Sequence, residues 1–268
     1  MAAGADDPGS ATTGRADDPV LETRGLVRRF GELVAVQDVS LQVPRGEFRS
    51  VIGPNGAGKT TLFNLITGVL PPTEGSVRFA GEDVTRLPPH ERVARGMGRS
   101  FQLTDVFGGL TVRENVRLAA QAARDEGFSP SEWMMRPTGA FDDVLADAEA
   151  VLEQVDLADR ADERAAALAY GDRRRLEIGI VLATDPDLVL LDEPTAGMSR
   201  EETAATMALV DDVLADRTLL LIEHDVDLVL DVSDRVTVLD RGSVLASGTP
   251  AEIAADDDVQ AAYLGGSR

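Results

Sequence analysis

Short stretches in which apolar and polar residues alternate make up the first part of the chain. Such alternation is typical of strands with one buried face, and it predicts strands within 25–30, 34–43 and 47–52. Turns between them are predicted at Phe30-Gly31 and at Pro44-Arg45-Gly46. The first folded part of the chain is therefore predicted to be β-structure.

Helical spacing of apolar residues dominates the middle of the chain, and strands return after it. A period near 3.6 predicts helices at 112–123, 144–155 and 173–182. Aliphatic runs at 188–191 and 219–222 have the length of buried parallel strands. This alternation predicts an α/β core with an inserted helical lobe. The other predicted elements are a helix at 60–68, a strand at 75–79, an entry into a loop at 98–102, strands at 188–192, 218–222, 235–239 and 243–247, and helices at 200–215 and 226–231.

The composition is that of a globular protein with an aliphatic core. Of the 268 residues, 43% are hydrophobic and 4% are aromatic, and no run approaches the roughly 20 apolar residues of a membrane-spanning helix. The chain has no cysteine, which excludes disulfides, thiolate zinc sites and thiol catalysis. Residues 1–19 are predicted to be a disordered acidic tail and lack the pattern of a secretory signal, so we expect a cytoplasmic protein.

The charge balance is strongly acidic. Asp and Glu total 47 against 26 basic residues, a net charge of -21, and Lys59 is the only lysine. Such a chain is a poor general binder of nucleic acid, which needs clustered positive charge. One hypothesis is adaptation to high intracellular salt, because the Debye length falls from about 10 Å at 0.1 M to about 3 Å at 1 M. The alternative is a GC-rich genome that favours Ala, Gly, Asp and Arg over Lys.

The segment from Gly53 to Thr60 fits the phosphate-loop pattern G-x-x-x-x-G-K-[ST] between a predicted strand and a predicted helix. Small residues let consecutive backbone N–H groups turn toward a phosphate, and the helix adds its positive end. Lys59 would bridge the β- and γ-phosphates, and the Thr60 hydroxyl would be a ligand of Mg²⁺. The residues expected to bind ATP here are Gly53, Pro54, Asn55, Gly56, Ala57, Gly58, Lys59, Thr60 and Thr61.

Two carboxylates, Asp192 and Glu193, follow four aliphatic residues at 188–191. A buried parallel strand that ends in acids places them at the carboxyl edge of the sheet, where nucleotides bind in open α/β folds. Asp192 is predicted to hold Mg²⁺ through water, and Glu193 to polarise the attacking water. Taken alone, this pattern also fits an ordinary strand end, and the phosphate loop is what favours the functional interpretation.

With these motifs the chain resembles the nucleotide-binding subunit of ATP-binding cassette (ABC) transporters over residues 20–264. The resemblance implies that Phe30 stacks on adenine, although a plain core role for Phe30 is the alternative. Gln102 matches the glutamine that joins the two lobes and senses Mg²⁺, and His224 matches the histidine that contacts the γ-phosphate. The other histidine, His90, is predicted to be exposed at a helix start.

The family's signature loop, usually Leu-Ser-Gly-Gly-Gln, aligns with Leu168, Ala169, Tyr170, Gly171 and Asp172, of which only the first and fourth match. The resemblance implies that this loop acts in trans on the partner's nucleotide, resting on backbone N–H groups. Asp172 adds a negative charge there, and Ser199 replaces the usual aspartate after Glu193. An alternative is that Asp172 caps a helix and that the arginines after it form a solvated face of that helix.

Further stretches are similar to the branched-chain amino acid importers of this family, with amide or urea importers as relatives. They are Tyr170-Gly171 followed by 174–178, and the segments 98–102, 222–225 and 262–265. The resemblance implies a P-loop ABC ATPase core with an antiparallel β subdomain and an inserted helical signature subdomain at about 103–184, with 265–268 as a tail. The implied catalytic residues are Glu193, His224, Gln102 and Lys59, and the implied metal site is Thr60, Gln102 and Asp192.

The implied partners are a second cassette, which is a paralogue or a copy of this chain, transmembrane permease subunits and, indirectly, a substrate-binding protein. The permease is expected to dock near Gln102 and 104–118, on the inner face of the membrane. Two other functions are alternatives. A soluble ABC-type ATP switch in DNA repair or translation usually has two cassettes or a long coiled coil, and a P-loop kinase would leave Gln102, 168–172 and His224 without a role.

Overall fold

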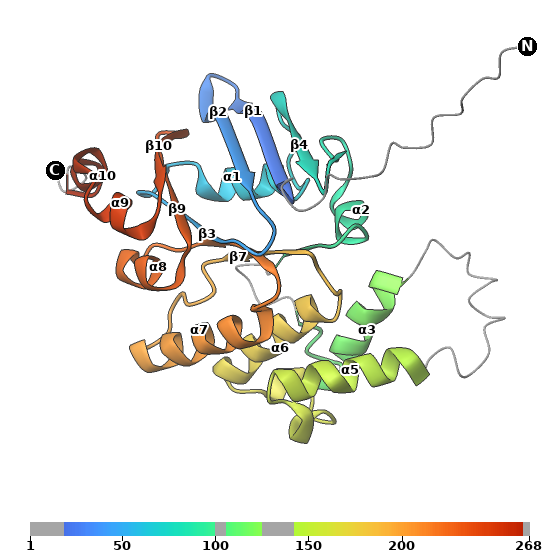
Figure 1. Cartoon of the computed structure of the whole chain (residues 1–268). Helices are drawn as coiled ribbons and strands as arrows, with labels where there is room; N and C mark the ends of the chain where they lie inside the picture. The colour runs from blue at the N-terminus through green and yellow to red at the C-terminus, as the bar shows by residue number, and fades with distance from the viewer. Residues whose placement is uncertain (1–18, 100–105, 125–141, 265–268) are drawn as a thin grey trace, which may run out of the picture.

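The computed structural model describes residues 19–99, 106–124 and 142–264 of the chain (Figure 1). Its two sheets lie one above the other with a helix between them, and a group of helices lies below. Gln102 and its neighbours Ser100 and Phe101 fall outside the described residues.

The larger sheet has six strands in the order β10-β9-β3-β8-β7-β6. The strands β9, β3, β8, β7 and β6 pair in parallel, and β10 is antiparallel to β9. All five residues of β7 and of β8 are buried, as expected where helices cover both faces of a parallel sheet. The strands are β3 (Phe48–Ile52), β6 (Met97–Arg99), β7 (Leu188–Asp192), β8 (Thr218–Ile222), β9 (Arg235–Asp240) and β10 (Ser243–Gly248).

The smaller sheet is antiparallel, with the strand order β2-β1-β4-β5. Helix α1 (Lys59–Ile66) lies between it and the larger sheet (Figure 1). Four side chains of α1 join a buried cluster with residues of both sheets, so the helix after the phosphate loop is fixed on two sides. The strands are β1 (Leu21–Phe30), β2 (Leu33–Val43), β4 (Glu74–Phe79) and β5 (Glu82–Asp83).

Helices α3 (Val112–Arg124), α5 (Asp142–Gln154) and α6 (Tyr170–Leu182) form the lower part of the molecule in Figure 1. Together with α7 (Arg200–Leu214) they share a second buried cluster with the opposite face of the large sheet. Alternation along β7 explains why the two clusters lie on opposite faces of the large sheet. Leu188 and Leu190 face α1, whereas Val189 and Leu191 face α6 and α7.

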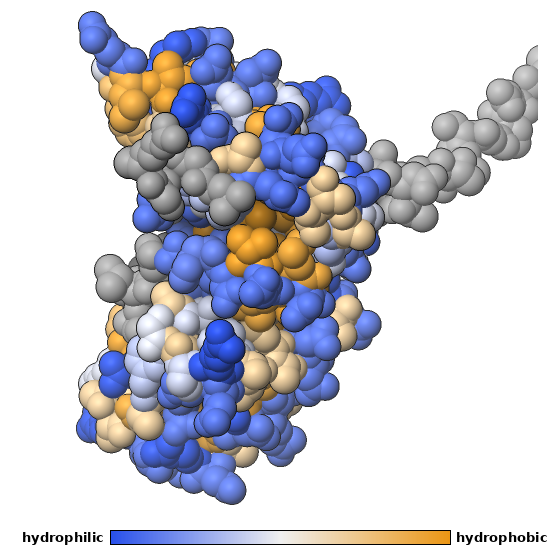
Figure 2. All heavy atoms as spheres, turned by 90° about the vertical axis from the view of Figure 1, so that its left-hand side faces the viewer, coloured by the Kyte–Doolittle hydropathy of each residue, from blue (hydrophilic) through white to orange (hydrophobic). Residues whose placement is uncertain are grey.

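The chain ends in a small C-terminal group of elements. Helices α8 (Val226–Val232), α9 (Pro250–Ala254) and α10 (Asp257–Leu264) pack with β9, β10 and Ile52 in a third buried cluster. Charged and polar residues cover most of the face that carries these elements, with apolar side chains in separate patches (Figure 2). Among the described residues, no helix is long and apolar enough to cross a membrane.

The predicted fold class is confirmed: a mainly parallel α/β core, an antiparallel sheet and a helical lobe. Residues 97–99 form the short strand β6 where we expected only an entry into a loop, because three residues give too little pattern to recognise. The helix start expected at His90 is found as α2 (Pro89–Val93). Helices α9 and α10 and the two-residue strand β5 were not predicted. His90 is exposed in α2, as expected.

Candidate nucleotide-binding site

The loop from Gly53 to Gly58 connects β3 to α1 and is held closely by neighbouring backbone. A Cβ atom on Gly58, whose φ is +100°, would lie 2.4 Å from the carbonyl oxygen of Ala35 in β2. A Cβ atom on Gly53, with φ +152°, would lie 2.2 Å from the carbonyl oxygen of Leu239 in β9. Only glycine fits at these two positions, so the loop's path is dictated by both sheets.

Lys59, the first residue of α1, turns its side chain back over the loop. Its Nζ donates hydrogen bonds to the carbonyl oxygens of Gly53 at 2.6 Å and Pro54 at 3.2 Å. Burial lowers the pKa of Lys59, and the negative charges of Glu193 and Asp192 oppose this effect. The ammonium is therefore hydrogen-bonded to the loop and feels the charge of the two carboxylates that the sequence singled out.

A cavity of about 570 Å³ opens above the loop, within the usual size range of small-molecule sites. At its rim the ring of Phe30 is 43% exposed, and the Arg28 guanidinium carbon lies 4.6 Å from the ring centroid. The structure thus brings together most of the predicted binding residues and Glu193. Four lining residues were not predicted as part of the site, and two of them, Val34 and Ala35, were assigned only to a predicted strand. The lining residues are Phe30, Leu33, Val34, Ala35, Asn55, Gly56, Gly58, Lys59, Thr60, Thr61, Glu193 and Arg241.

Asp192 ends β7 on the face that α1 covers, because it continues the alternation of Leu188 and Leu190. The residue is 1% exposed, and Nη2 of Arg99 lies 3.2 Å from its Oδ2 atom. Burial raises the pKa of Asp192, and Arg99 acts in the opposite direction. Arg99 was not predicted as part of the site, and nothing in a three-residue strand would have indicated it.

The Oδ1 atom of Asp192 is buried and has no hydrogen-bond partner among the described residues. An acceptor of this kind fits a magnesium ion or a water molecule bound to one. The part of the chain that the structure describes holds no group of three or more His, Cys, Asp or Glu that could bind a metal by itself. Phosphate oxygens would therefore have to complete the coordination, as is usual for Mg²⁺ in nucleotide sites.

Glu193 leaves the strand with a left-handed backbone, at φ +48°. Its N–H donates to the carbonyl oxygen of Ile222 in β8 at 2.9 Å, and its carbonyl oxygen accepts from Nη2 of Arg174 at 3.3 Å. Left-handed backbone in a residue with a side chain costs about 1 kcal/mol or more and persists only where the surroundings impose it. In Glu193 the left-handed backbone breaks the alternation of side chains along β7, and the Glu193 side chain lines the cavity.

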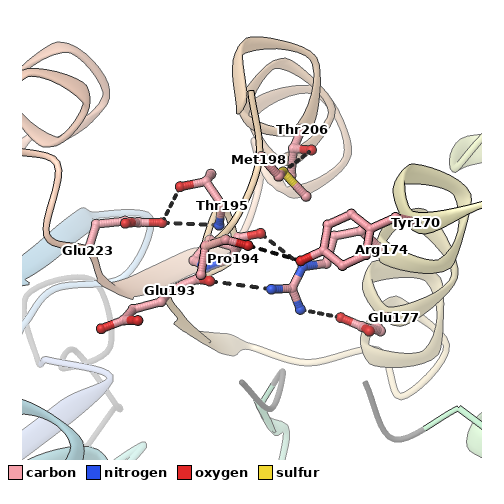
Figure 3. Close-up of polar contacts among 10 residues, drawn as sticks. Tyr170, Arg174, Glu177, Glu193, Pro194, Thr195, Met198, Thr206 and Glu223 are labelled. Carbon is pink, nitrogen blue, oxygen red and sulfur yellow. Dashed lines mark hydrogen bonds and ion pairs between the residues drawn. The ribbon is translucent and has the colours of Figure 1, made fainter. Parts of the chain in front are cut away.

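The loop after Glu193 is held from two sides (Figure 3). From α6, Nε of Arg174 donates to the Pro194 carbonyl at 2.9 Å, and the Tyr170 hydroxyl donates to the Ala196 carbonyl at 2.9 Å. From the end of β8, the Glu223 carboxylate accepts two hydrogen bonds from Thr195. Arg174 is 6% exposed, so the interpretation of these arginines as a solvated face is wrong at this position.

Among the described residues, the other predicted site residues lie outside the cavity lining. His224 follows β8 with an exposed side chain, and its Nδ1 atom is 3.5 Å from Oε2 of Glu223. In the signature loop Leu168 is buried, Tyr170 is half-exposed, and Asp172 forms an ion pair with Arg160. None of the five signature-loop residues lines the cavity over the phosphate loop of the same chain.

Ser199, at the position where the family's aspartate is usual, has a local structural role. It is the N-cap residue of α7: its hydroxyl accepts from the Glu202 N–H at 3.3 Å, and its own N–H donates to Oε2 of Glu202 at 2.8 Å. This reciprocal arrangement is a capping box, which satisfies two N–H groups that a helix start leaves open.

Comparison with known proteins connects these features to one family. A model described as ABC transporter matches residues 36–196, and one described as branched-chain amino acid ATP-binding cassette transporter matches residues 243–268. The chain is 41% identical to the high-affinity branched-chain amino acid transport ATP-binding protein BraF of Pseudomonas aeruginosa, over 92% of this chain and 98% of that protein. It is 40% identical to LivG of Escherichia coli, which carries the same description, with the same coverage.

Solved structures connect the chain to the same family. The chain is similar to an ATP-binding cassette of an ABC transporter in its ADP conformation, with a TM-score of 0.78 and 32% identity, over 92% of this chain and 99% of that one. A nucleotide-free cassette of an ABC transporter matches with a TM-score of 0.77 and 31% identity, over 91% and 98% of the two chains.

Proposed function

The chain belongs to the ABC transporter family as an ATP-hydrolysing subunit, and we propose that its ATP hydrolysis energises the uptake of branched-chain amino acids. The proposal for the ATPase site rests on the cavity that joins Phe30, Lys59 and Glu193. The proposal for the substrate class rests on one observation above all. The match to the branched-chain model covers the C-terminal residues 243–268, which lie outside the part matched by the general family model.

We propose that each polar residue of the site has a separate role toward ATP. Lys59 would hold the β- and γ-phosphates, since its ammonium is a compact point charge. Thr60, Asp192 and Gln102 would hold Mg²⁺ together with phosphate oxygens, and the ion would neutralise negative charge on those oxygens. Glu193 would polarise the attacking water, and His224 would contact the γ-phosphate.

The proposed assembly is a pair of cassettes beneath a permease, on the inner face of the membrane. The signature loop would complete the partner's site, because Tyr170 and Asp172 lie outside the cavity of their own chain. The relatives named above are ATP-binding proteins of transport systems, which supports a permease and a substrate-binding protein as further components. Phe107 lies within the predicted docking segment 104–118 and is 62% exposed, and its backbone is fixed by two hydrogen bonds to Asn115.

Uptake measurements in cells that lack this chain test the proposal. The wild-type chain should restore uptake of radiolabelled leucine, isoleucine and valine, whereas the matched variant Lys59→Ala should not. Urea and a short amide serve as the comparison substrates. Restored uptake of urea or amide without leucine would contradict the substrate class, and unchanged uptake of every substrate would contradict the transport function and favour a soluble ATP switch.

A further inference from the structure

We propose that Arg174 is a positioning residue for hydrolysis, which fixes the backbone of Glu193 to helix α6 and so determines where the Glu193 carboxylate lies. The proposal rests on the role proposed above for Glu193. It concerns a residue of α6 that lines no part of the cavity. Its effect on the reaction would therefore be exerted through the backbone alone.

The guanidinium of Arg174 distributes its donors over three partners (Figure 3). Nε donates to the Pro194 carbonyl at 2.9 Å, Nη2 donates to the Glu193 carbonyl at 3.3 Å, and Nη1 is paired with Glu177. Both carbonyls belong to the point where the chain leaves the sheet after β7. A planar, forked group can serve two consecutive carbonyls in one fixed orientation, which an ammonium cannot do as well.

These contacts determine the direction of one side chain. The peptide before the Glu193 Cα atom is fixed by the hydrogen bond from its N–H to Ile222. The peptide after this Cα atom is fixed by the hydrogen bond from Arg174 to the Glu193 carbonyl. When both peptides are fixed, φ and ψ are fixed, and so is the direction in which the Cβ atom leaves the backbone. The left-handed φ of +48° makes this restraint necessary, because the residue would otherwise relax toward an extended conformation.

The ion pair that holds Arg174 is itself buried. Arg174 is 6% exposed and Glu177 is 8% exposed, and they lie three positions apart on the same face of α6. A buried ion pair is weak evidence for stability, because well-packed apolar residues often stabilise a fold equally well. Its presence here is better explained by the two carbonyls that the guanidinium must reach.

The same helix begins at the signature loop. Tyr170 lies four positions before Arg174, and its hydroxyl donates to the Ala196 carbonyl at 2.9 Å. Helix α6 and the backbone of 193–196 are therefore joined by three hydrogen bonds, from Tyr170 and Arg174. A shift of α6 when the signature loop meets the partner's nucleotide would displace Glu193 in its own site. The contact would thus couple closure of the pair to the position of Glu193.

Two variants separate positioning from stability. Arg174→Lys keeps a cation beside Glu177 but loses the fork over the two carbonyls. The double variant Arg174→Met/Glu177→Met removes both buried charges at once, which avoids leaving one of them uncompensated. Arg175→Lys is the matched control, because Arg175 is the next residue of the helix and its Nη1 atom pairs with Asp156 at 2.9 Å at the surface.

Three quantities are measured on the full chain: kcat for ATP, the Kd for ATP, and hydrogen exchange of the Glu193 and Thr195 amides. Both test variants should lower kcat by about 10- to 100-fold, the effect of misplacing a reacting group by about 1 Å. Their Kd should stay within about threefold, since the phosphate loop is unchanged. Exchange of the Glu193 and Thr195 amides should accelerate while exchange at Leu190 stays slow, and Arg175→Lys should match the wild type in all three measurements.

Several outcomes would overturn the inference. One is wild-type kcat in a folded double variant, and another is an equal loss of kcat in Arg175→Lys. A third is a loss of ATP affinity that accounts for the loss of rate. The role of Glu193 is tested separately by Glu193→Gln. If that variant hydrolyses ATP normally, the proposed role of Glu193 fails; if it is inactive while the double variant is fully active, only the positioning role of Arg174 fails.

Discussion

The Glu223 carboxylate accepts hydrogen bonds from the N–H of Thr195 at 3.1 Å and from its hydroxyl at 2.6 Å, across 28 positions of the chain. Glu223 is fully buried, so water does not replace a donor that is lost. We therefore expect Thr195→Val to lower the free energy of unfolding by about 1–3 kcal/mol, because the buried carboxylate loses its hydroxyl donor and keeps the backbone N–H. Chemical denaturation measures this change.

Thr195→Ser is the control for this contact, since it keeps the hydroxyl and removes only a methyl group. It should lose about 1 kcal/mol or less. Equal losses in the two variants would show that packing of the methyl group, rather than the bond to Glu223, stabilises this loop.

Lys59 offers a direct measurement of electrostatics in the site, because a lysine-specific ¹³C label reports on this residue alone. Burial holds its pKa below the ordinary lysine value in the nucleotide-free protein. The negative phosphates of ATP should raise that pKa, and by linkage ATP affinity should then fall as the pH rises through the pKa of the free protein. NMR titration with and without ATP tests both statements. A lysine signal that titrates at or above the ordinary value without nucleotide, or that is unmoved by ATP, would contradict them.

The phosphate loop should distinguish sharply between two of its glycines. A Cβ atom on Gly58 would lie 2.4 Å from the Ala35 carbonyl oxygen, whereas one on Gly56 would meet nothing within 4 Å. Gly58→Ala should therefore shift the loop and weaken ATP binding at least about tenfold, and Gly56→Ala should do so much less, although its φ of +82° adds about 1 kcal/mol of strain. Isothermal titration with ATP compares them, and equal affinities would contradict the steric argument.

Asp172 gives the signature loop a negative charge, which is partly compensated by its ion pair with Arg160. If this loop meets the partner's phosphates, Asp172→Gln should lower the KM for ATP by about two- to fivefold, the range of a partly exposed charge interaction. Asp159→Gln, on the short helix η2 (Ala158–Arg160), makes the same charge change and should leave the KM unchanged. A KM that falls equally in both variants would assign the effect to net charge alone.

Spacing along the chain predicted the parts of the site that are defined locally. Lys59 follows the glycines directly, and Asp192 and Glu193 end an aliphatic run, so pattern and position are sufficient to find them. Their meeting in one place follows from parallel strands, whose carboxyl ends share one edge of the sheet.

The contacts that hold the site could not be read from the sequence in the same way. Residues 173–175 are three consecutive arginines, which point in three directions around a helix, and only tertiary packing shows that Arg174 is the buried one. Arg99 reaches Asp192 from a strand too short to show a pattern. Helix α9 did have a usable signal, since Thr249, Pro250 and Glu252 form a capping box with proline at the helix start.

The role of Glu193 in hydrolysis is tested most directly by comparing ATP binding and ATP turnover in Glu193→Gln. Glu193 lines the cavity with Lys59 but is expected to act on the attacking water rather than to hold the nucleotide. We expect ATP affinity to stay within a few fold of the wild type while kcat falls at least about 100-fold, the effect of losing a general base. Hydrolysis at the wild-type rate in a variant that binds ATP normally would contradict this role.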